Sequence, residues 1–179
     1  MPRLHFLKAH TEAHFQDMSL LHALGWRTAY RAFIPKDYLD REIRDDRWVP
    51  FFHDYCGGGR YQGLILYDGG QPLCCGVYGP ARRELQPPGA PDLSQWGELV
   101  SLYAHPEHWR CGYGSLLLGE ILLRLKKAGY PGCFLYVLRE NTRARRFYEK
   151  HGFTWDGCSI EDTLPPGTVL TDLRYRKTL

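Results

Sequence analysis

The spacing of apolar and polar residues predicts one strand followed by helices in the first third of the chain. Alternating residues predict a strand at Arg3–Lys8. Apolar residues at three- and four-residue spacing predict a long helix over Ala13–Phe33. Pro35 ends it, because proline disfavours helix at the preceding residue. Shorter helices are predicted at Lys36–Arg44 and Arg47–Tyr55, the second stopped by a run of glycines.

The middle of the chain predicts a hairpin and then a third strand. Tyr61–Tyr67 and Gln71–Tyr78 read as strands on either side of Asp68-Gly69-Gly70. The Asp-Gly step permits the positive φ angles of a tight turn. A proline-rich loop then leads to a strand at Trp96–Ala104.

The last part of the chain predicts a strand-helix-strand unit, a further helix and two closing strands. After a glycine turn, apolar residues recur at helical spacing as far as Leu125. Cys133–Leu138 is nearly all apolar, as in a central strand covered on both faces. Asn141 can cap the next helix, and Gly152 can end it. The closing strands are predicted at positions 153–160 and 169–176.

Composition changes this picture little. The 179 residues are enough for one domain, and 44% apolar with 24% charged residues is ordinary globular usage. A net charge of +3 does not indicate nucleic-acid binding, and no apolar stretch predicts a membrane span or a leader. Six cysteines without a C-x-x-C pair predict reduced thiols in the cytoplasm. His10 and His14 lie four residues apart, but without a third ligand nearby we predict no metal site.

Candidate chemistry begins at Arg110–Leu118, where a glycine turn joins a strand to an apolar helix. Gly112 and Gly114 lack a Cβ, and the first N–H groups of a helix have no intrahelical acceptor, so the turn can bind an anion. A nucleotide P-loop is excluded, since Ser115-Leu116 follows the last glycine in place of Lys-Ser/Thr. The dinucleotide fingerprint is excluded by Leu117, which stands where it needs a glycine or alanine. A simple tight turn remains the alternative.

Two segments together resemble the GNAT superfamily of acyl-coenzyme A dependent N-acyltransferases: His105–Ser115 and Asn141–Phe153. The closing segment Leu173–Arg176 and the amino-terminal helices are also similar to that family. The first position of its Arg/Gln-x-x-Gly-x-Gly/Ala pattern is occupied by Trp109, and Arg110 stands one residue late. The resemblance implies one N-acetyltransferase domain over residues 1–179. It also implies an α/β fold with a central, mixed, mostly antiparallel sheet of about six to seven strands flanked by helices.

The resemblance further implies that acetyl-CoA is the acyl donor. The backbone amides of Cys111–Ser115 would bind its pyrophosphate, and its pantetheine arm would lie between splayed strands at Leu102–Ala104 and Tyr136–Leu138. Asn141 would hydrogen-bond the pantetheine amides, or cap its helix, or do both. The implied donor-binding residues are Leu102, Tyr103, Ala104, Arg110, Cys111, Gly112, Tyr113, Gly114, Ser115 and Asn141.

Acetylation of an amine needs a base and an acid. A lysine-like amine has a pKa of about 10.4 and is protonated at neutral pH, so a proton acceptor is required. Glu98 is the candidate base by resemblance, and a solvated charge at the strand end is the alternative. Tyr148 resembles the family's general acid that protonates the leaving thiolate, with core packing as the alternative. A backbone N–H near Leu102 or Tyr103 is the implied oxyanion donor. Cys111 has no evident catalytic partner.

The predicted function is therefore acetyl transfer from acetyl-CoA to a primary amine by direct attack, with a small molecule or peptide as acceptor. The alternative is a non-catalytic acyl-CoA-binding sensor or scaffold module. A nucleic-acid-binding domain using arginines within Arg139–Arg146 is disfavoured, and no membrane partner is expected. By resemblance, Phe33–Asp40 and Ser159–Thr168 would line the acceptor groove. Whether the protein is a monomer or a homodimer stays open.

Overall fold

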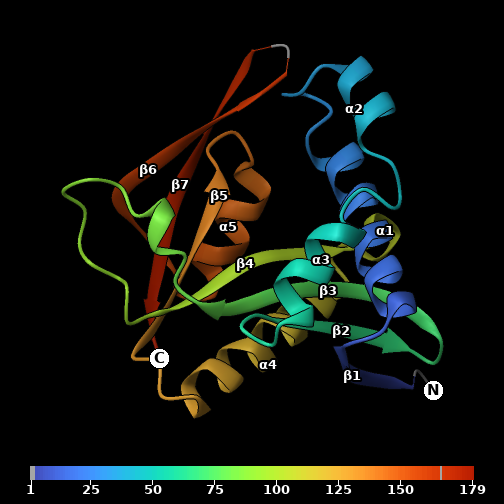
Figure 1. The fold of residues 1–179 in the computed structure, drawn as a ribbon, viewed down its shortest axis with the longest axis horizontal. Helices are drawn as coiled ribbons and strands as arrows, with labels where there is room; N and C mark the ends of the chain where they lie inside the picture. Colours follow the sequence, from blue (N-terminus) through green and yellow to red (C-terminus); the bar gives the residue numbers. More distant parts are fainter. Residues whose placement is uncertain (1–2, 166) are drawn as a thin grey trace. The chain divides into compact units, whose positions relative to one another are not determined.

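The protein forms an α/β fold with a seven-stranded sheet, seen in a computed structural model that describes residues 3–165 and 167–179 (Figure 1). The strands are β1 (Leu4–Ala9), β2 (Gln62–Asp68), β3 (Gln71–Pro80), β4 (Gly97–Ala104), β5 (Gly132–Leu138), β6 (Thr154–Leu164) and β7 (Thr168–Thr178). Hydrogen-bonded neighbours follow the order β1-β2-β3-β4-β5-β7-β6. β4 pairs with β5 in parallel, whereas β1–β2, β2–β3, β5–β7 and β6–β7 are antiparallel. The predicted mixed, mostly antiparallel sheet is confirmed.

The helices lie close to their predicted positions. They are α1 (Glu12–Ala29), α2 (Lys36–Glu42), α3 (Val49–Gly57), α4 (Tyr113–Lys127) and α5 (Thr142–Lys150), with short 3-10 turns at Arg83–Leu85 and Pro106–His108. The main difference is that α1 ends at Ala29 rather than Phe33. The Tyr30 carbonyl accepts hydrogen bonds from both Phe33 and Ile34, so the chain turns there before Pro35. No helix in the two described ranges is both long and apolar enough to cross a membrane.

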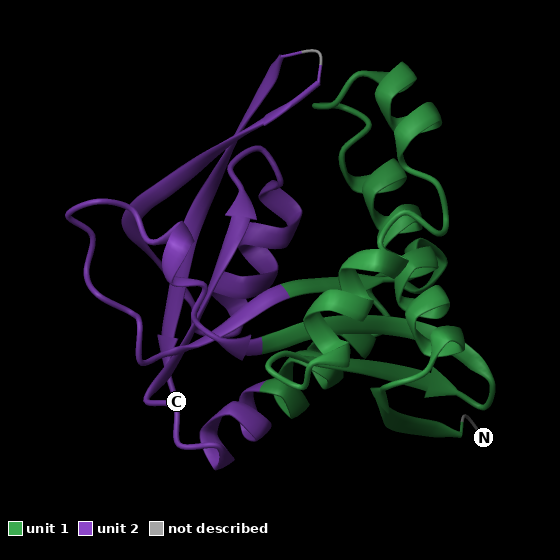
Figure 2. Ribbon diagram, in the orientation of Figure 1, with its two compact units in different colours: residues 1–78, 101–121 green, residues 79–100, 122–179 purple. Residues whose placement is uncertain are grey.

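The described chain divides into two compact units (Figure 2). Unit 1 contains residues 1–78 and 101–121, and unit 2 contains residues 79–100 and 122–179. β3, β4 and α4 each contribute residues to both units. The predicted site residues are therefore described below unit by unit.

In unit 1, α1 packs closely against the end of β4. A Cβ built on Gly25 would lie 2.5 Å from Cδ1 of Tyr103, so only glycine permits this approach. The His22 ring lies 4.2 Å from the Tyr103 ring and 5.0 Å from the Phe52 ring, measured between centroids. Burial lowers the pKa of His22 to about 3, so this imidazole is a neutral part of the core.

In unit 2, α5 is fixed to β7 through Tyr175. The Tyr175 hydroxyl donates to Oε1 of Glu149 at 2.9 Å and accepts from Nε of Arg145 at 3.1 Å. Arg145 also donates to the Arg139 carbonyl at 3.1 Å. Arg145 therefore links α5 to β7 and to the start of the β5–α5 connection.

A buried ion pair in unit 2 holds the loop that follows β3. Arg174 and Asp156 form it with an Nε–Oδ2 distance of 2.7 Å, and neither side chain is exposed. Arg174 also donates to Oε1 of Gln86 at 2.8 Å and to the Pro91 carbonyl at 3.1 Å. Leaving a buried charge unpaired costs several kcal/mol, so this network fixes the 86–91 loop segment to β7.

Candidate active site

The glycine turn lies in unit 1, between the end of β4 and α4. Gly112 has φ of +85°, and a Cβ built on it would meet nothing within 4 Å, so the turn has open space beside it. Gly114 lies inside the first turn of α4. The second left-handed residue is Arg110, with φ of +69°, a conformation that non-glycine residues rarely adopt. The backbone therefore reverses twice just before the helix begins.

The start of α4 presents unpaired backbone donors. No acceptor in residues 3–165 or 167–179 takes a hydrogen bond from the N–H groups of Gly112, Tyr113, Gly114 or Ser115. The Cys111 amide, which the resemblance also implies as a donor, instead bonds the His108 carbonyl at 3.3 Å. Four free N–H groups at the positive end of a helix dipole make a site suited to phosphate oxygens.

Trp109 has a structural role that the motif comparison did not show. Its indole Nε1 donates to the Ala104 carbonyl at 3.0 Å, which ties the turn to the end of β4. The Tyr103 hydroxyl lies 3.3 Å from that of Tyr30, the residue that follows α1. Of the predicted segment Leu102–Ala104, the Tyr103 side chain is thus directed toward α1. Any part that Tyr103 plays in binding the donor therefore falls to its backbone.

Asn141 and Tyr148 lie at the two ends of α5 in unit 2. The Asn141 Oδ1 atom accepts from the Ala144 N–H at 3.1 Å, so the predicted cap is confirmed. Its Nδ2 atom has no acceptor among the described residues, although the side chain is only 9% exposed. The Tyr148 ring is buried and lies 5.2 Å from Phe147 and 5.8 Å from Phe153, measured between centroids. These contacts are the predicted packing, and the acid role of its hydroxyl remains a prediction.

Glu98 lies on β4 in unit 2 and forms a buried ion pair with Arg82. Its Oε1 accepts from Nη2 of Arg82 at 2.6 Å and from Nε at 2.9 Å, and its Oε2 accepts the Arg82 backbone N–H at 2.8 Å. Glu98 has no exposed surface, so the alternative prediction of a solvated strand-end charge is wrong. Both carboxylate oxygens of Glu98 thus accept hydrogen bonds from Arg82. This pairing could not be predicted from the sequence, because a long loop separates Arg82 from Glu98.

Two further polar residues of the unit 2 sheet were not singled out from the sequence. The Tyr136 hydroxyl donates to the Leu85 carbonyl at 2.9 Å, and burial raises the pKa of Tyr136 to about 12. Burial, followed by the nearby carboxylates of Asp162 and Glu140, raises the pKa of Asp172 on β7 to about 6. A single polar residue in a strand pattern does not reveal such a cluster, because the cluster forms through strand pairing.

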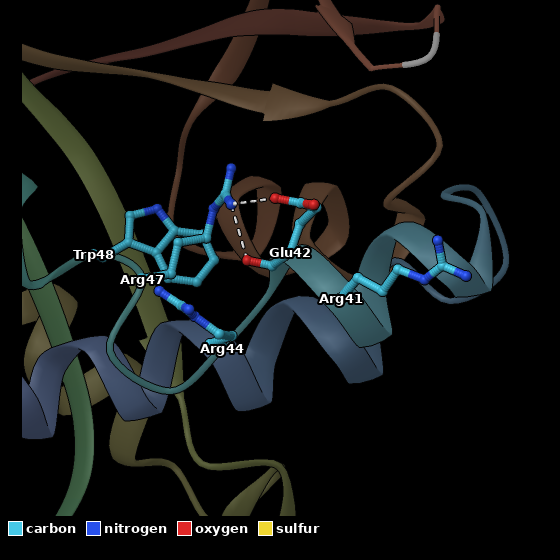
Figure 3. A pocket seen from close by; sticks show the side chains of 5 residues that line it. All are labelled: Arg41, Glu42, Arg44, Arg47 and Trp48. Atoms are coloured by element: carbon cyan, nitrogen blue, oxygen red, sulfur yellow. Dashed lines mark hydrogen bonds and ion pairs between the residues drawn. The ribbon is translucent and has the colours of Figure 1, made fainter.

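A hollow of about 500 Å³ lies elsewhere in unit 1, at the end of α2 (Figure 3). It is lined by Arg41, Glu42, Arg44, Arg47 and Trp48. Figure 3 shows Arg47 beside Trp48 and bonded to Glu42, with the Arg41 side chain extending away from both. The hollow contains none of the predicted site residues, and no group of three or more His, Cys, Asp or Glu side chains in the described ranges could hold a metal ion.

Comparison with known families shows the family to which this fold belongs. The family described as "Acetyltransferase (GNAT) family" matches residues 24–153, which include the turn, β5 and α5. The chain belongs to this acetyltransferase (GNAT) family. The predicted resemblance is confirmed over most of the chain, and the unpaired amides lie within the matched segment.

Individual relatives of this GNAT chain match parts of its sequence. The [ribosomal protein bS18]-alanine N-acetyltransferase of Haemophilus influenzae is 46% identical over 55 residues, which are 31% of this chain and 37% of that protein. The spermidine N(1)-acetyltransferase of Thermoplasma acidophilum is 41% identical over 71 residues, 40% of this chain and 41% of that protein. The chain thus aligns with well under half the length of these two relatives.

The fold extends further than the sequence similarity. The crystal structure of PaiA N-acetyltransferase from Thermoplasma acidophilum in complex with coenzyme A superposes with a TM-score of 0.71 at 18% identity. The superposition covers 98% of this chain and 99% of that one. At this identity the comparison shows a shared fold.

Proposed function

We propose that this GNAT protein transfers an acetyl group from acetyl-CoA to a primary amine by direct attack, without a covalent enzyme intermediate. The observation that carries the proposal is the set of four unpaired N–H groups at Gly112–Ser115, within the matched family segment. The open space beside Gly112 lets a phosphate approach the backbone. A related fold, that of PaiA, has been crystallised with coenzyme A.

Donor binding is assigned to the turn and, in unit 2, to the start of α5. The amides of Gly112–Ser115 would bind the pyrophosphate, with Arg110 and Cys111 at its edge. The free Nδ2 of Asn141 would donate to a pantetheine carbonyl while Oδ1 keeps the helix cap. Within unit 2, β4 and β5 pair in parallel from Gly97 with Cys133 to Leu99 with Leu135.

The reaction balances as a simple acyl transfer. The acceptor ammonium loses a proton, the neutral nitrogen attacks the thioester carbonyl, and the tetrahedral intermediate expels the thiolate as the C–S bond breaks. A backbone N–H near Leu102 or Tyr103 is proposed to stabilise the oxyanion, and Tyr148 to protonate the thiolate. Glu98 is the proton acceptor nominated by the sequence. Because Arg82 engages both of its oxygens, Glu98 could take this role only through a water or after that pair opens.

The acceptor is proposed to be a cationic primary amine, either a small molecule or a peptide amino terminus. Relatives named for ribosomal protein alanine and for spermidine support an amine as the class. Phe33–Asp40 and Ser159–Thr168 remain the proposed walls of the acceptor groove. We propose a monomer or homodimer in the cytoplasm that does not bind nucleic acid, in keeping with six free thiols and the internal bonding of Arg145.

The test is an acceptor panel with acetyl-CoA in which release of the coenzyme A thiol is followed. The panel contains spermidine, alanine-terminated peptides, lysine, amino acids and aminoglycosides. Amine-dependent thiol release, with acetylated product seen by mass spectrometry, supports the proposal. Binding of acetyl-CoA without release for any amine would favour the sensor or scaffold alternative.

A further inference from the structure

Unit 2 contains two carboxylates in contrasting environments on one face of its sheet. Glu98 on β4 lies opposite Phe134 on β5, and Asp172 on β7 lies opposite Leu138, also on β5. Directly opposite residues share a face, and Phe134 and Leu138 are four residues apart, so all four side chains share one face. At a rise of about 3.3 Å per residue the two carboxylate positions are ~13 Å apart along the sheet.

Strand register gathers further acidic groups around Asp172. Its second neighbour is Ile160 on β6, and Asp162 follows two residues later on the same face of that strand. Glu140 follows Leu138 by two residues, where the chain leaves β5. Leu138 and Ile160 thus flank Asp172 with apolar surface, while two carboxylates lie nearby.

Asp172 has no counterion of its own. Its carboxylate makes no hydrogen bond or ion pair with any residue in ranges 3–165 and 167–179. Arg82, whose charge acts on Asp172, is bonded to Glu98. Arg174, two residues along β7 on the same face, is bonded to Asp156. Glu98 is therefore neutralised and enclosed, whereas Asp172 is partly exposed and unpaired.

We propose that Asp172 binds the acceptor ammonium and accepts its proton, and that Glu98 forms a structural pair with Arg82. The inference rests on the proposed acetyl transfer and names the residue that prepares the nucleophile. The ammonium N–H bond breaks, its proton forms an O–H bond on the Asp172 carboxylate, and the electron pair stays on nitrogen for attack on the thioester. The proton passes to water when the product leaves.

The surroundings of Asp172 strengthen it as a base. Burial and the charges of Asp162 and Glu140 raise its pKa from 3.8 to about 6, and the charge of Arg82 opposes this rise only in part. A base whose pKa is nearer that of the amine accepts the proton with a smaller free-energy cost. The same cluster attracts a cation, because an incoming ammonium relieves the repulsion among the three carboxylates.

The decisive comparison is Asp172→Asn against Glu84→Gln. Glu84 is an exposed carboxylate of unit 2 on the 3-10 turn Arg83–Leu85, outside the residues proposed to bind the donor or the acceptor. With the best acceptor of the panel, Asp172→Asn should lower kcat/KM by about 10²-fold or more at pH 7.5, the usual scale for loss of a general base. Glu84→Gln should keep the wild-type value, and Asp172→Glu should recover part of the loss. The thermal shift with acetyl-CoA should be unchanged in all three.

The pH profile separates a base from a merely structural carboxylate. In the wild type, kcat/KM should fall below pH 6 as Asp172 is protonated, and Asp172→Asn should lose this limb. Asp162→Asn and Glu140→Gln each remove a charge that raises the pKa of Asp172, so each should move the limb to lower pH. These two variants give a test even if Asp172→Asn fails to fold.

The outcomes are distinct. The assignment of Asp172 as the base is overturned if Asp172→Asn turns over within about 3-fold of wild type and its kcat/KM still falls below pH 6. It is also overturned if the pH of this fall does not move in either Asp162→Asn or Glu140→Gln. Wild-type protein that releases no thiol with any amine overturns the proposed function itself.

Discussion

The unusual ionisation of Asp172 can be measured without any substrate. Burial above all raises its pKa in the folded protein from 3.8 to about 6. At 1.36 kcal/mol per unit, ionised Asp172 costs the folded state about 3 kcal/mol above pH 7. Because the pKa of Asp172 is higher in the folded than in the unfolded state, its contribution to stability is fully present below pH 3.8 and is lost as pH rises through 6. About 2 kcal/mol of this loss should develop between pH 4 and pH 7.

The perturbation is again Asp172→Asn, which keeps the shape and removes the charge. Urea unfolding of the variant and the wild type at several pH values gives the difference in unfolding free energy. The variant should gain about 2 kcal/mol relative to wild type between pH 4 and pH 7, whatever constant offset the substitution adds. Glu84→Gln should show no comparable trend. A difference for Asp172→Asn that stays constant within about 0.5 kcal/mol would refute the reasoning about its environment.

Three further predictions concern the proposed donor site and the Glu98 pair. Gly112→Val should abolish the thermal shift with acetyl-CoA, because valine strains the left-handed backbone and blocks the amides. In the wild type this ligand at a hundredfold excess over its Kd should stabilise the fold by about 2.7 kcal/mol. An unchanged shift of the melting temperature would place the donor elsewhere. Tyr148→Phe should lower turnover but leave acetyl-CoA affinity and folding intact, and the loss of turnover should be smaller for acyl donors with more acidic thiols. Wild-type turnover of this variant, measured where the chemical step limits the rate, would exclude the acid role. Glu98→Gln should lower the unfolding free energy by about 3 kcal/mol, because Arg82 loses its counterion. The double variant Glu98→Gln with Arg82→Met should recover part of that loss. Denaturant unfolding that shows no loss for Glu98→Gln would argue against the buried pair.

The sequence by itself determined the order and type of the elements and the place of the glycine turn. Apolar spacing located α4 and β5, and the Asp-Gly step located the β2–β3 turn, where Gly69 has φ of +57°. These features depend on residues close together in the chain, so local periodicity and turn chemistry suffice to predict them. Asn141 was identified as a cap for the same reason.

Tertiary structure decided the electrostatic environment of the site. Glu98 and Arg82 meet only because β3 and β4 are joined by a long loop that folds back, so a charge that could have been solvated is buried and paired. Asp172 acquires its acidic neighbours through the register of β7 with β5 and β6, which no local pattern specifies. Charges act through space over several ångströms, and residues far apart in the sequence set the pKa of each carboxyl. The sequence could therefore name an acidic residue for the amine proton, but only the paired strands show which carboxylate is left without a counterion.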